Sequence, residues 1–203
     1  MSTLPPVNFE RHRLFERYPF FVGTLPPDLV RVAKTQFESL WNLHPEKSNE
    51  ILIHGRMVPI PRKQQAYGRD YYFSGTVNEA LPVPELLAPF LAWVREAIDT
   101  RLNGLLLNWY DGTKAHYIGA HRDSRKGLVT GSPIVTISVG EERTFRLRLP
   151  KEKGFVDFEA TAGTVFSMPW ETNLGVKHEV PHTAQSKGRR ISITARAFAD
   201  DVS

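Results

Sequence analysis

Two helical patterns dominate the first hundred residues of the chain. The first begins after Pro26-Pro27, with Asp28 as its expected N-cap. Its apolar stripe consists of Leu29, Ala33, Phe37, Leu40 and Trp41. The second pattern spans residues 84–102 and stops at Asn103-Gly104, and its stripe consists of Leu87, Leu91, Val94 and Ile98. Because Pro89 lies inside this second pattern, we expect the helix itself to begin nearer to Pro89.

Short extended segments separated by turn residues make up most of the remaining chain. One group lies at 51–75, between the two helical patterns, and has a hairpin tip at His54-Gly55. From residue 105 onward the expected strands are 105–110, 116–123, 134–139, 144–149, 164–168 and 190–198. Within 144–149, apolar residues alternate with arginines, which is the pattern of a strand that buries one face.

Helices followed by many short strands predict an α+β fold that is mostly β. The expected architecture is a double-stranded β-helix, or jelly roll, with helices packed on one face of an antiparallel sandwich. A chain of 203 residues is long enough to bury a core and short enough for a single domain. Hydrophobic residues make up 41% and charged residues 24%, as in ordinary globular proteins, and no apolar run is long enough to cross a bilayer.

The composition restricts the chemistry that the chain can carry. It has no cysteine, so disulfides and thiolate metal sites are excluded, and a metal ion would have to be held by His, Asp or Glu. The net charge of +4 is a mild bias towards anionic partners. The first residues, MSTLPPVNFERHRLF, lack the apolar core of a secretory signal, so we expect a cytoplasmic protein, and by default a monomer.

A candidate metal site begins at His121-Arg122-Asp123. Residues two apart on a strand share a face, so His121 and Asp123 could grip one ion there. Two histidines and a carboxylate on one side of an octahedral ion leave three positions open for other ligands. The motif alone is weak, because a surface histidine near a surface aspartate is common. His178 and His182 are both candidates for the third ligand.

A candidate anion site lies near the C-terminus. In a strand over 190–196, one face carries two arginines and two hydroxyls, and the other face is apolar. The polar face consists of Arg190, Ser192, Thr194 and Arg196, and it would suit a dicarboxylate, because guanidinium pairs with carboxylate through two parallel hydrogen bonds. Asn108 and Tyr110, two apart on an earlier strand, could add hydrogen bonds. The alternative is an edge strand with its charged residues turned to solvent.

Together these motifs resemble those of the AlkB family of nucleic-acid demethylases, which depend on Fe(II) and 2-oxoglutarate. The resemblance rests on NWYDG (108–112), IGAHRD (118–123), GSPIVTISVG (131–140), HEVP (178–181) and RISITAR (190–196). It extends upstream to PRKQQAYG (61–68) and YYFSG (71–75), which resemble the substrate lid of members that act on alkylated DNA. It therefore implies N-terminal helices and a nucleotide-recognition lid over 1–104 and a jelly-roll core over 105–203.

The resemblance also implies roles for individual residues. His121, Asp123 and His178 would hold Fe(II), with His182 as the minority alternative for the third ligand. Arg190 would pair with the distal carboxylate of 2-oxoglutarate, assisted by Ser192 and Tyr110, and Arg196 and Asn108 would lie near its metal-bound end. The expected substrate-binding residues are Arg62, Tyr71, Phe73, Ser74 and Arg125, with a flipped base held between Phe73 and the His121 ring.

The implied reaction uses Fe(II), 2-oxoglutarate and O2 to dealkylate an N-alkylated base in DNA or RNA, releasing an aldehyde, succinate and CO2. The protein would supply positioning and electrostatics, and the cofactors would supply the oxidising power.

Three departures from the family pattern affect the substrate. Arg125 stands where several members place an acid that contacts an exocyclic amine, and a cation cannot accept that hydrogen bond. Arg125 could instead bind a phosphate. His54 occupies the hairpin tip where members acting on duplexes carry a bulky apolar wedge. Single-stranded DNA or RNA is therefore an alternative substrate to duplex DNA. The loop over 111–117 is one residue longer than the corresponding loop of the family members that this sequence resembles.

Two other functions remain possible. One is an oxygenase of the same fold that acts on a free nucleotide or on a substrate other than nucleic acid. The other is a jelly-roll binding module without catalytic activity, which would require the complete ligand set and both arginines to be incidental.

Overall fold

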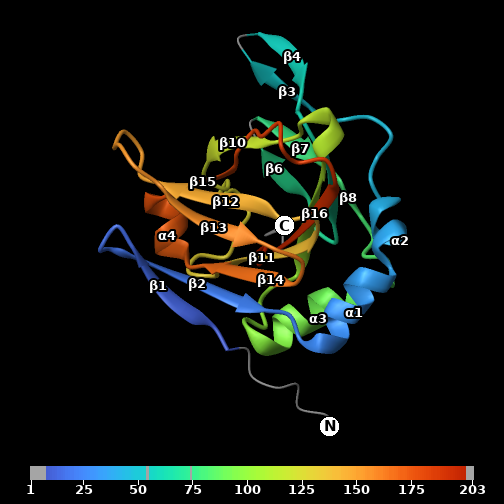
Figure 1. Cartoon of the computed structure of the whole chain (residues 1–203), viewed down its shortest axis with the longest axis horizontal. Coiled ribbons are helices and arrows are strands. Elements are labelled where there is room, and N and C mark those ends of the chain that lie inside the picture. The colour runs from blue at the N-terminus through green and yellow to red at the C-terminus, as the bar shows by residue number, and fades with distance from the viewer. Residues whose placement is uncertain (1–7, 54, 74, 200–203) are drawn as a thin grey trace.

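Two β-sheets lie face to face at the centre of the fold in a computed structural model that describes residues 8–53, 55–73 and 75–199 (Figure 1). The larger sheet has the strand order β1 (Glu10–Leu14), β2 (Tyr18–Thr24), β14 (Thr164–Met168), β11 (Ile134–Gly140), β16 (Arg189–Arg196), β9 (Gly104–Asp111), β5 (Lys63–Tyr67) and β8 (Ala80–Leu81). The smaller sheet has the order β10 (Ile118–His121), β15 (Lys177–Val180), β12 (Arg143–Arg148) and β13 (Val156–Ala160). Neighbouring strands are antiparallel except for the parallel pair β5 and β8.

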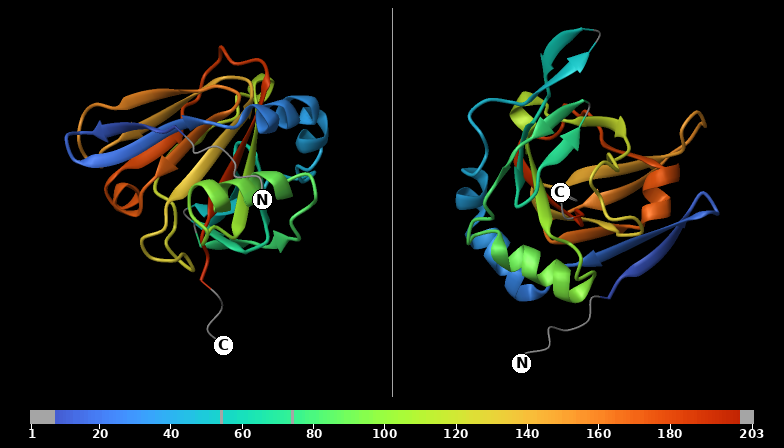
Figure 2. Two further views of the ribbon diagram at one scale, coloured as in Figure 1. Left: turned by 90° about the horizontal axis from the view of Figure 1, so that it is seen from below. Right: turned by 180° about the vertical axis from the view of Figure 1, so that it is seen from behind.

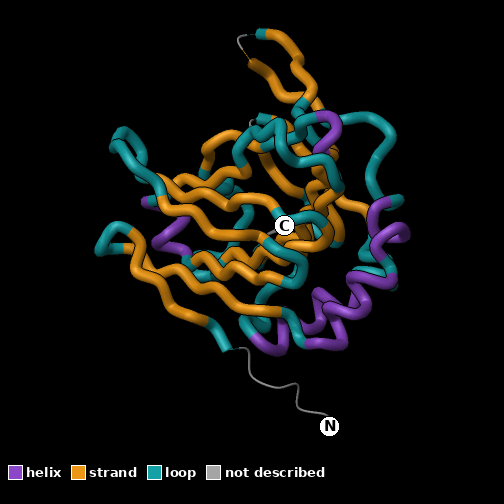
Figure 3. The backbone as a smooth tube through the Cα atoms, in the orientation of Figure 1, coloured by secondary structure: helices purple, strands orange, loops and turns teal. Residues whose placement is uncertain are grey.

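Three helices cover the outer face of the larger sheet, on one side of the molecule (Figures 2 and 3). They are α1 (Pro27–Thr35), α2 (Phe37–Trp41) and α3 (Ala88–Ala97). A fourth helix, α4 (Trp170–Gly175), connects β14 to β15, and a short 3-10 helix (Gly112–Lys114) follows β9. Among the helices of the described chain, none combines the length and apolar character needed to cross a membrane.

The alternation of side chains along β9 and β16 separates the core from the site. Leu105, Leu107 and Trp109 face the helices and pack with Ile191 and Ile193 of the neighbouring strand. The intervening residues of both strands face the space between the two sheets. A second apolar cluster, which includes Phe20, Phe145, Leu147, Phe166 and Met168, fills part of that space.

Two hairpins stand at the open end of the sandwich. The first consists of β3 (Glu50–Ile53) and β4 (Arg56–Pro59) and projects away from the body of the molecule (Figure 1). The second consists of β6 (Tyr71–Phe73) and β7 (Thr76–Asn78) and lies closer to the sheets. Extended segments were expected over 51–75, which includes β4, β6 and most of β3, whereas β7 lies beyond that range. His54, the expected tip of the first hairpin, is outside the described residues.

The mostly β sandwich with helices on one face confirms the predicted fold class, but the helix bounds differ from the expected ones. Pro26 occupies the N-cap position of α1, and Asp28 lies in the first turn, so the expected cap was wrong. The first helical pattern is broken at Gln36 into α1 and α2. Pro89 lies in the first turn of α3, where the missing N–H of a proline costs no hydrogen bond. The helix ends at Ala97, before the stop that was expected at Asn103-Gly104.

Candidate metal centre and its pocket

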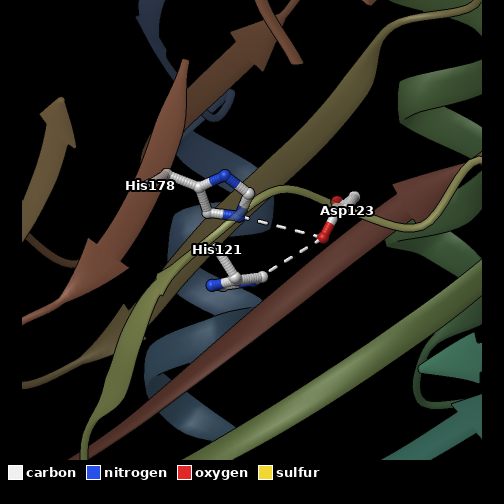
Figure 4. Close-up of side chains that lie close together, drawn as sticks. All are labelled: His121, Asp123 and His178. Atoms are coloured by element: carbon white, nitrogen blue, oxygen red, sulfur yellow. Dashed lines mark ion pairs between the residues drawn. The ribbon is translucent and has the colours of Figure 1, made fainter. Parts of the chain in front are cut away.

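Two histidines and one aspartate meet between the sheets (Figure 4). His121 ends β10, His178 lies on β15, and the two strands pair so that these residues are register partners. The Nε2 atoms of His121 and His178 lie 3.7 and 3.8 Å from Oδ1 of Asp123, respectively. The three potential ligand atoms lie within 4.8 Å of one another, so they could hold one metal ion.

His182, the alternative third ligand, lies elsewhere. It is exposed on the loop after β15, and its ring packs edge-on against Tyr117 with a centroid distance of 5.7 Å. The geometry therefore favours His178, whose side chain is buried beside His121 with ring centroids 4.3 Å apart.

Asp123 reaches the cluster by a route that the sequence did not predict. The strand expected over 116–123 ends at His121, so the two ligands do not share a strand face. The buried side chain of Asn173, on α4, holds the backbone of Asp123 instead. Its Oδ1 accepts from the Asp123 N–H at 3.0 Å, and its Nδ2 donates to the Asp123 carbonyl at 3.3 Å. A contact across 50 residues leaves no local signal in the sequence, so the role of Asn173 was missed.

The local charges keep the ligands in forms that bind metal. Burial alone would raise the pKa of Asp123, but Arg196 and the two histidines lower it well below its usual range. Burial also lowers the pKa of His178 to about 3 and lowers that of His121. Nδ1 of His121 lies 2.8 Å from the Gly119 carbonyl, and a proton on Nδ1 donating there leaves Nε2 free for the ion.

The inner face of β16 and its neighbours forms the polar floor of the pocket. Arg190, Ser192, Thr194 and Arg196 all line the pocket. β16 is a central strand between β11 and β9, so the edge-strand alternative was wrong. The register places Arg190 opposite Tyr110 and Ser192 opposite Asn108, so the predicted residues lie together. Arg190 is 1% exposed and donates to Ser138 Oγ at 2.7 Å.

A row of buried side chains orients Asn108. Its Oδ1 accepts from Arg62 Nε at 2.8 Å and from Gln64 Nε2 at 2.9 Å. Gln64 in turn accepts from Asn78 Nδ2 of the second hairpin, at 3.5 Å. Because Oδ1 is occupied by two donors, the Nδ2 protons of Asn108 remain for a ligand in the pocket. Gln64 lies within the PRKQ segment, but nothing in the sequence indicated this contact.

The lid residues lie over the metal cluster. Tyr71 and Phe73 line the same pocket as the ligands, and the Tyr71 hydroxyl donates to Asp123 Oδ1 at 3.2 Å. The Phe73 ring stands edge-on to the His121 ring, with a centroid distance of 6.4 Å. The guanidinium of Arg62 lies over the Phe73 ring at 5.5 Å. Ser74 lies outside the described residues.

Arg125 lies apart from this group. It is exposed on the loop after Asp123 and lines a neighbouring cavity with Arg122 and Asn173, so its expected role in substrate binding stays a prediction.

The residues present fit a divalent cation together with a dicarboxylate. The donor set is the oxygen and imidazole set that iron accepts. Among the described residues, four guanidinium nitrogens of the pocket are buried without a hydrogen-bond partner: Arg62 Nη2, Arg190 Nε and Nη1, and Arg196 Nη1. Buried donors without partners are unusual in proteins, and oxygen acceptors of bound ligands, carboxylates above all, would satisfy them.

Comparisons with known proteins agree with this chemistry. The model of the 2OG-Fe(II) oxygenase superfamily matches residues 33–196. DNA oxidative demethylase ALKBH2 from Mus musculus is 30% identical over 159 residues, which are 72% of this chain and 66% of that protein. The same enzyme from Bos taurus is 29% identical over 161 residues, 72% of this chain and 56% of that protein.

Two further similarities extend over more of the chain. Alpha-ketoglutarate-dependent dioxygenase alkB homolog 3 from Rattus norvegicus is 30% identical over 198 residues, 91% of this chain and 64% of that protein. The solved structure of OsALKBH1 covers 95% of this chain with a TM-score of 0.59 at 12% identity, a likeness of fold. The chain thus spans between 56% and 66% of the length of these curated relatives.

Proposed function

Because the chain belongs to the 2OG-Fe(II) oxygenase superfamily, and within it to the AlkB family, we propose that it is a dioxygenase that removes alkyl groups from the nitrogens of nucleic-acid bases. The observation that carries this proposal is a joint placement in one pocket beneath the lid. The His121, Asp123 and His178 cluster lies there together with guanidinium nitrogens of Arg190 and Arg196 that have no hydrogen-bond partner among the described residues.

His121, Asp123 and His178 would hold Fe(II), and Arg190 would pair with the distal carboxylate of 2-oxoglutarate. When bound, Fe(II) and 2-oxoglutarate would supply, together with O2, the oxidising chemistry that turns an N-alkyl group into a free aldehyde, with release of succinate and CO2. Ser192, Tyr110 and Asn108 line the same pocket and would donate hydrogen bonds to the co-substrate. Arg196 holds Asp123 in its ionised form.

Aromatic side chains form part of the pocket wall. Tyr71, Phe73, Phe145 and Phe166 all line the pocket. The aromatic lid would stack a base that has been turned out of its strand, because the alkylated nitrogen cannot be reached inside a stacked duplex.

The projecting hairpin supports a nucleic-acid substrate. Leu52 and Met57 are 58% and 52% exposed there, and Val58 beside them is also exposed. Apolar side chains gathered on an exposed surface commonly mark an interaction site, and base faces are apolar partners for such residues. The name of the relative ALKBH2, a DNA oxidative demethylase, is consistent with this substrate class.

The test is turnover with defined substrates. The protein is loaded anaerobically with Fe(II) and 2-oxoglutarate, mixed with 1-methyladenine or 3-methylcytosine oligonucleotides or with the free nucleosides, and exposed to air. Succinate formed together with loss of the methyl group from the oligonucleotides supports the proposal. Demethylation of the free nucleosides alone favours the free-nucleotide alternative. Absence of succinate from iron-loaded protein, with every substrate, contradicts the dioxygenase activity.

A further inference from the structure

Arg62 is a buried guanidinium with no acidic partner in the part of the chain that the structure describes. It is 2% exposed, its Nε donates to the Asn108 amide at 2.8 Å, and its Nη2 has no hydrogen-bond partner. It lies over the Phe73 ring, against which a base is proposed to stack. Burial lowers the pKa of Arg62, but a guanidinium stays protonated at neutral pH. The substrate side of the pocket therefore contains an uncompensated positive charge.

The carboxylates that line this pocket are already paired. Within the described chain they are Asp123, which accepts two hydrogen bonds from Arg196, and Glu179, which accepts one from Arg148. Neither is free to balance a cationic ligand. The loop that follows Asp123 continues with Ser124, Arg125 and Lys126 and adds no acid.

The charge balance of the lining residues is positive. Three arginines (Arg62, Arg190 and Arg196) face two carboxylates, which gives +3 − 2 = +1. Loading does not change this balance, because the two positive charges of Fe(II) cancel the two negative charges of 2-oxoglutarate.

We propose that this pocket selects uncharged N-alkylated bases that carry a carbonyl oxygen where cytosine and adenine carry their exocyclic amine, and disfavours cationic ones. This inference rests on the proposed function and specifies its substrate class. N3-methyluracil, N3-methylthymine and N1-methylguanine are neutral and present such an oxygen, which Arg62 Nη2 can reach as a donor. N3-methylcytosine and N1-methyladenine are cations near neutral pH, and they would place like charge beside Arg62.

The expected discrimination is large enough to measure. Two like charges several ångströms apart, at an effective dielectric constant of about 20, disfavour binding by about tenfold or more. A buried donor that finds its acceptor adds to the preference, because an analogue without the acceptor leaves that donor unsatisfied.

The test uses two nearly isosteric lesions, 3-methyluracil and 3-methylcytosine, in the same oligonucleotide sequence. They differ at the C4 substituent and in charge. We expect kcat/KM to favour 3-methyluracil by about tenfold or more in the wild-type protein, and Arg62→Gln to reduce that ratio by about tenfold. Arg62→Lys keeps the charge and should keep most of the preference.

Lys63→Gln is the matched control, because it removes a positive charge from the next residue. The Lys63 ammonium contacts the Glu46 carbonyl rather than the pocket, so the ratio between the two lesions should not change. Fluorescence anisotropy of both oligonucleotides, with Mn(II) in place of iron, measures the same preference as affinity without turnover.

The outcomes separate this inference from the proposed function. Demethylation of both lesions with 3-methylcytosine equal or preferred overturns the charge selection and leaves the dealkylase standing. An Arg62→Gln variant that loses 2-oxoglutarate affinity and keeps the wild-type ratio also overturns it, because Arg62 would then serve the co-substrate. Succinate formation without loss of methyl groups from any oligonucleotide overturns the nucleic-acid function and the inference together.

Discussion

Arg196 holds Asp123 by a single oxygen. Its Nε and Nη2 both donate to Asp123 Oδ2, at 3.1 and 2.7 Å, and Oδ1 remains turned towards the two histidines. Both side chains are nearly fully buried, so solvent screens this pair only weakly. The carboxylate is therefore ionised and oriented before a metal ion arrives.

Replacing Arg196 with leucine should weaken metal binding. The buried carboxylate would lose its counter-charge, the pKa of Asp123 would rise, and a proton would compete with the ion. We expect the affinity for Mn(II), measured by calorimetric titration without 2-oxoglutarate, to fall by about 10- to 100-fold. Arg148→Leu, which removes the partner of Glu179 instead, should leave it unchanged. Equal affinities in the two variants would contradict the role of Arg196.

Asn173→Ala should loosen Asp123, because the Asn173 side chain holds the backbone of that metal ligand. Two hydrogen bonds to Asp123 would be lost, and we expect the free energy of unfolding to fall by about 1–3 kcal/mol. Mn(II) affinity should fall by about tenfold as Asp123 becomes less well positioned. Glu171→Ala, at an exposed position of the same helix, is the control for both measurements. A variant that is less stable but binds Mn(II) normally would limit Asn173 to a structural role.

Gln64→Glu should reverse the amide of Asn108. A glutamate offers an acceptor where Gln64 Nε2 now donates, so the Asn108 amide would turn its Nδ2 towards residue 64 and its Oδ1 towards the pocket. This reversal would also break the hydrogen bond from Arg62 Nε. Anaerobic titration should then show about tenfold weaker binding of 2-oxoglutarate. Gln65→Glu is the matched control, because Gln65 donates to the carbonyls of Ala66 and Glu79, away from this network. Similar affinities in both variants would refute the reversal.

The metal-free protein should lose stability in mild acid because of His178. Its pKa in the fold is about 3, against about 6.5 in an unfolded chain. As the pH falls below about 6.5 the unfolded chain takes up a proton that the folded chain refuses, so the free energy of unfolding decreases, by up to about 1.4 kcal/mol per pH unit. Urea unfolding from pH 7.5 to 5, with chelator present, measures this slope. The slope should be shallower in His178→Asn, and an identical slope would rule His178 out as its source.

The faces of β9 and β16 could be predicted from sequence alone because alternation along a strand is local. Apolar and polar residues in RISITAR separate onto the helix side and the pocket side as expected, with Ile191 and Ile193 in the core and Arg190 and Ser192 in the pocket. The pairing of Ser192 with Asn108 then follows from the sheet register.

Contacts between distant segments could not be predicted in this way. The sequence suggested Asp123 as a ligand through a shared strand face, but the strand ends at His121, and a side chain from α4 positions Asp123. β1 was also missed, because its charged sequence ERHRL shows no clear alternation, as is common for an edge strand. Its place in the sheet depends on pairing with β2, which local sequence does not encode.

β16 contributes to both the hydrophobic core and the pocket, so a change in its register would affect folding and activity together. One face closes the helix-side core and the other carries the arginines of the pocket, with a period of two residues. A slip of one residue against β9 or β11 would bury Arg190 and Arg196 under the helices and turn isoleucines into the pocket. Such a chain would not be a folded enzyme with low activity, because it would lack a core. Insertions or deletions within 189–196 should therefore yield insoluble protein, whereas those in the β12–β13 turn should be tolerated.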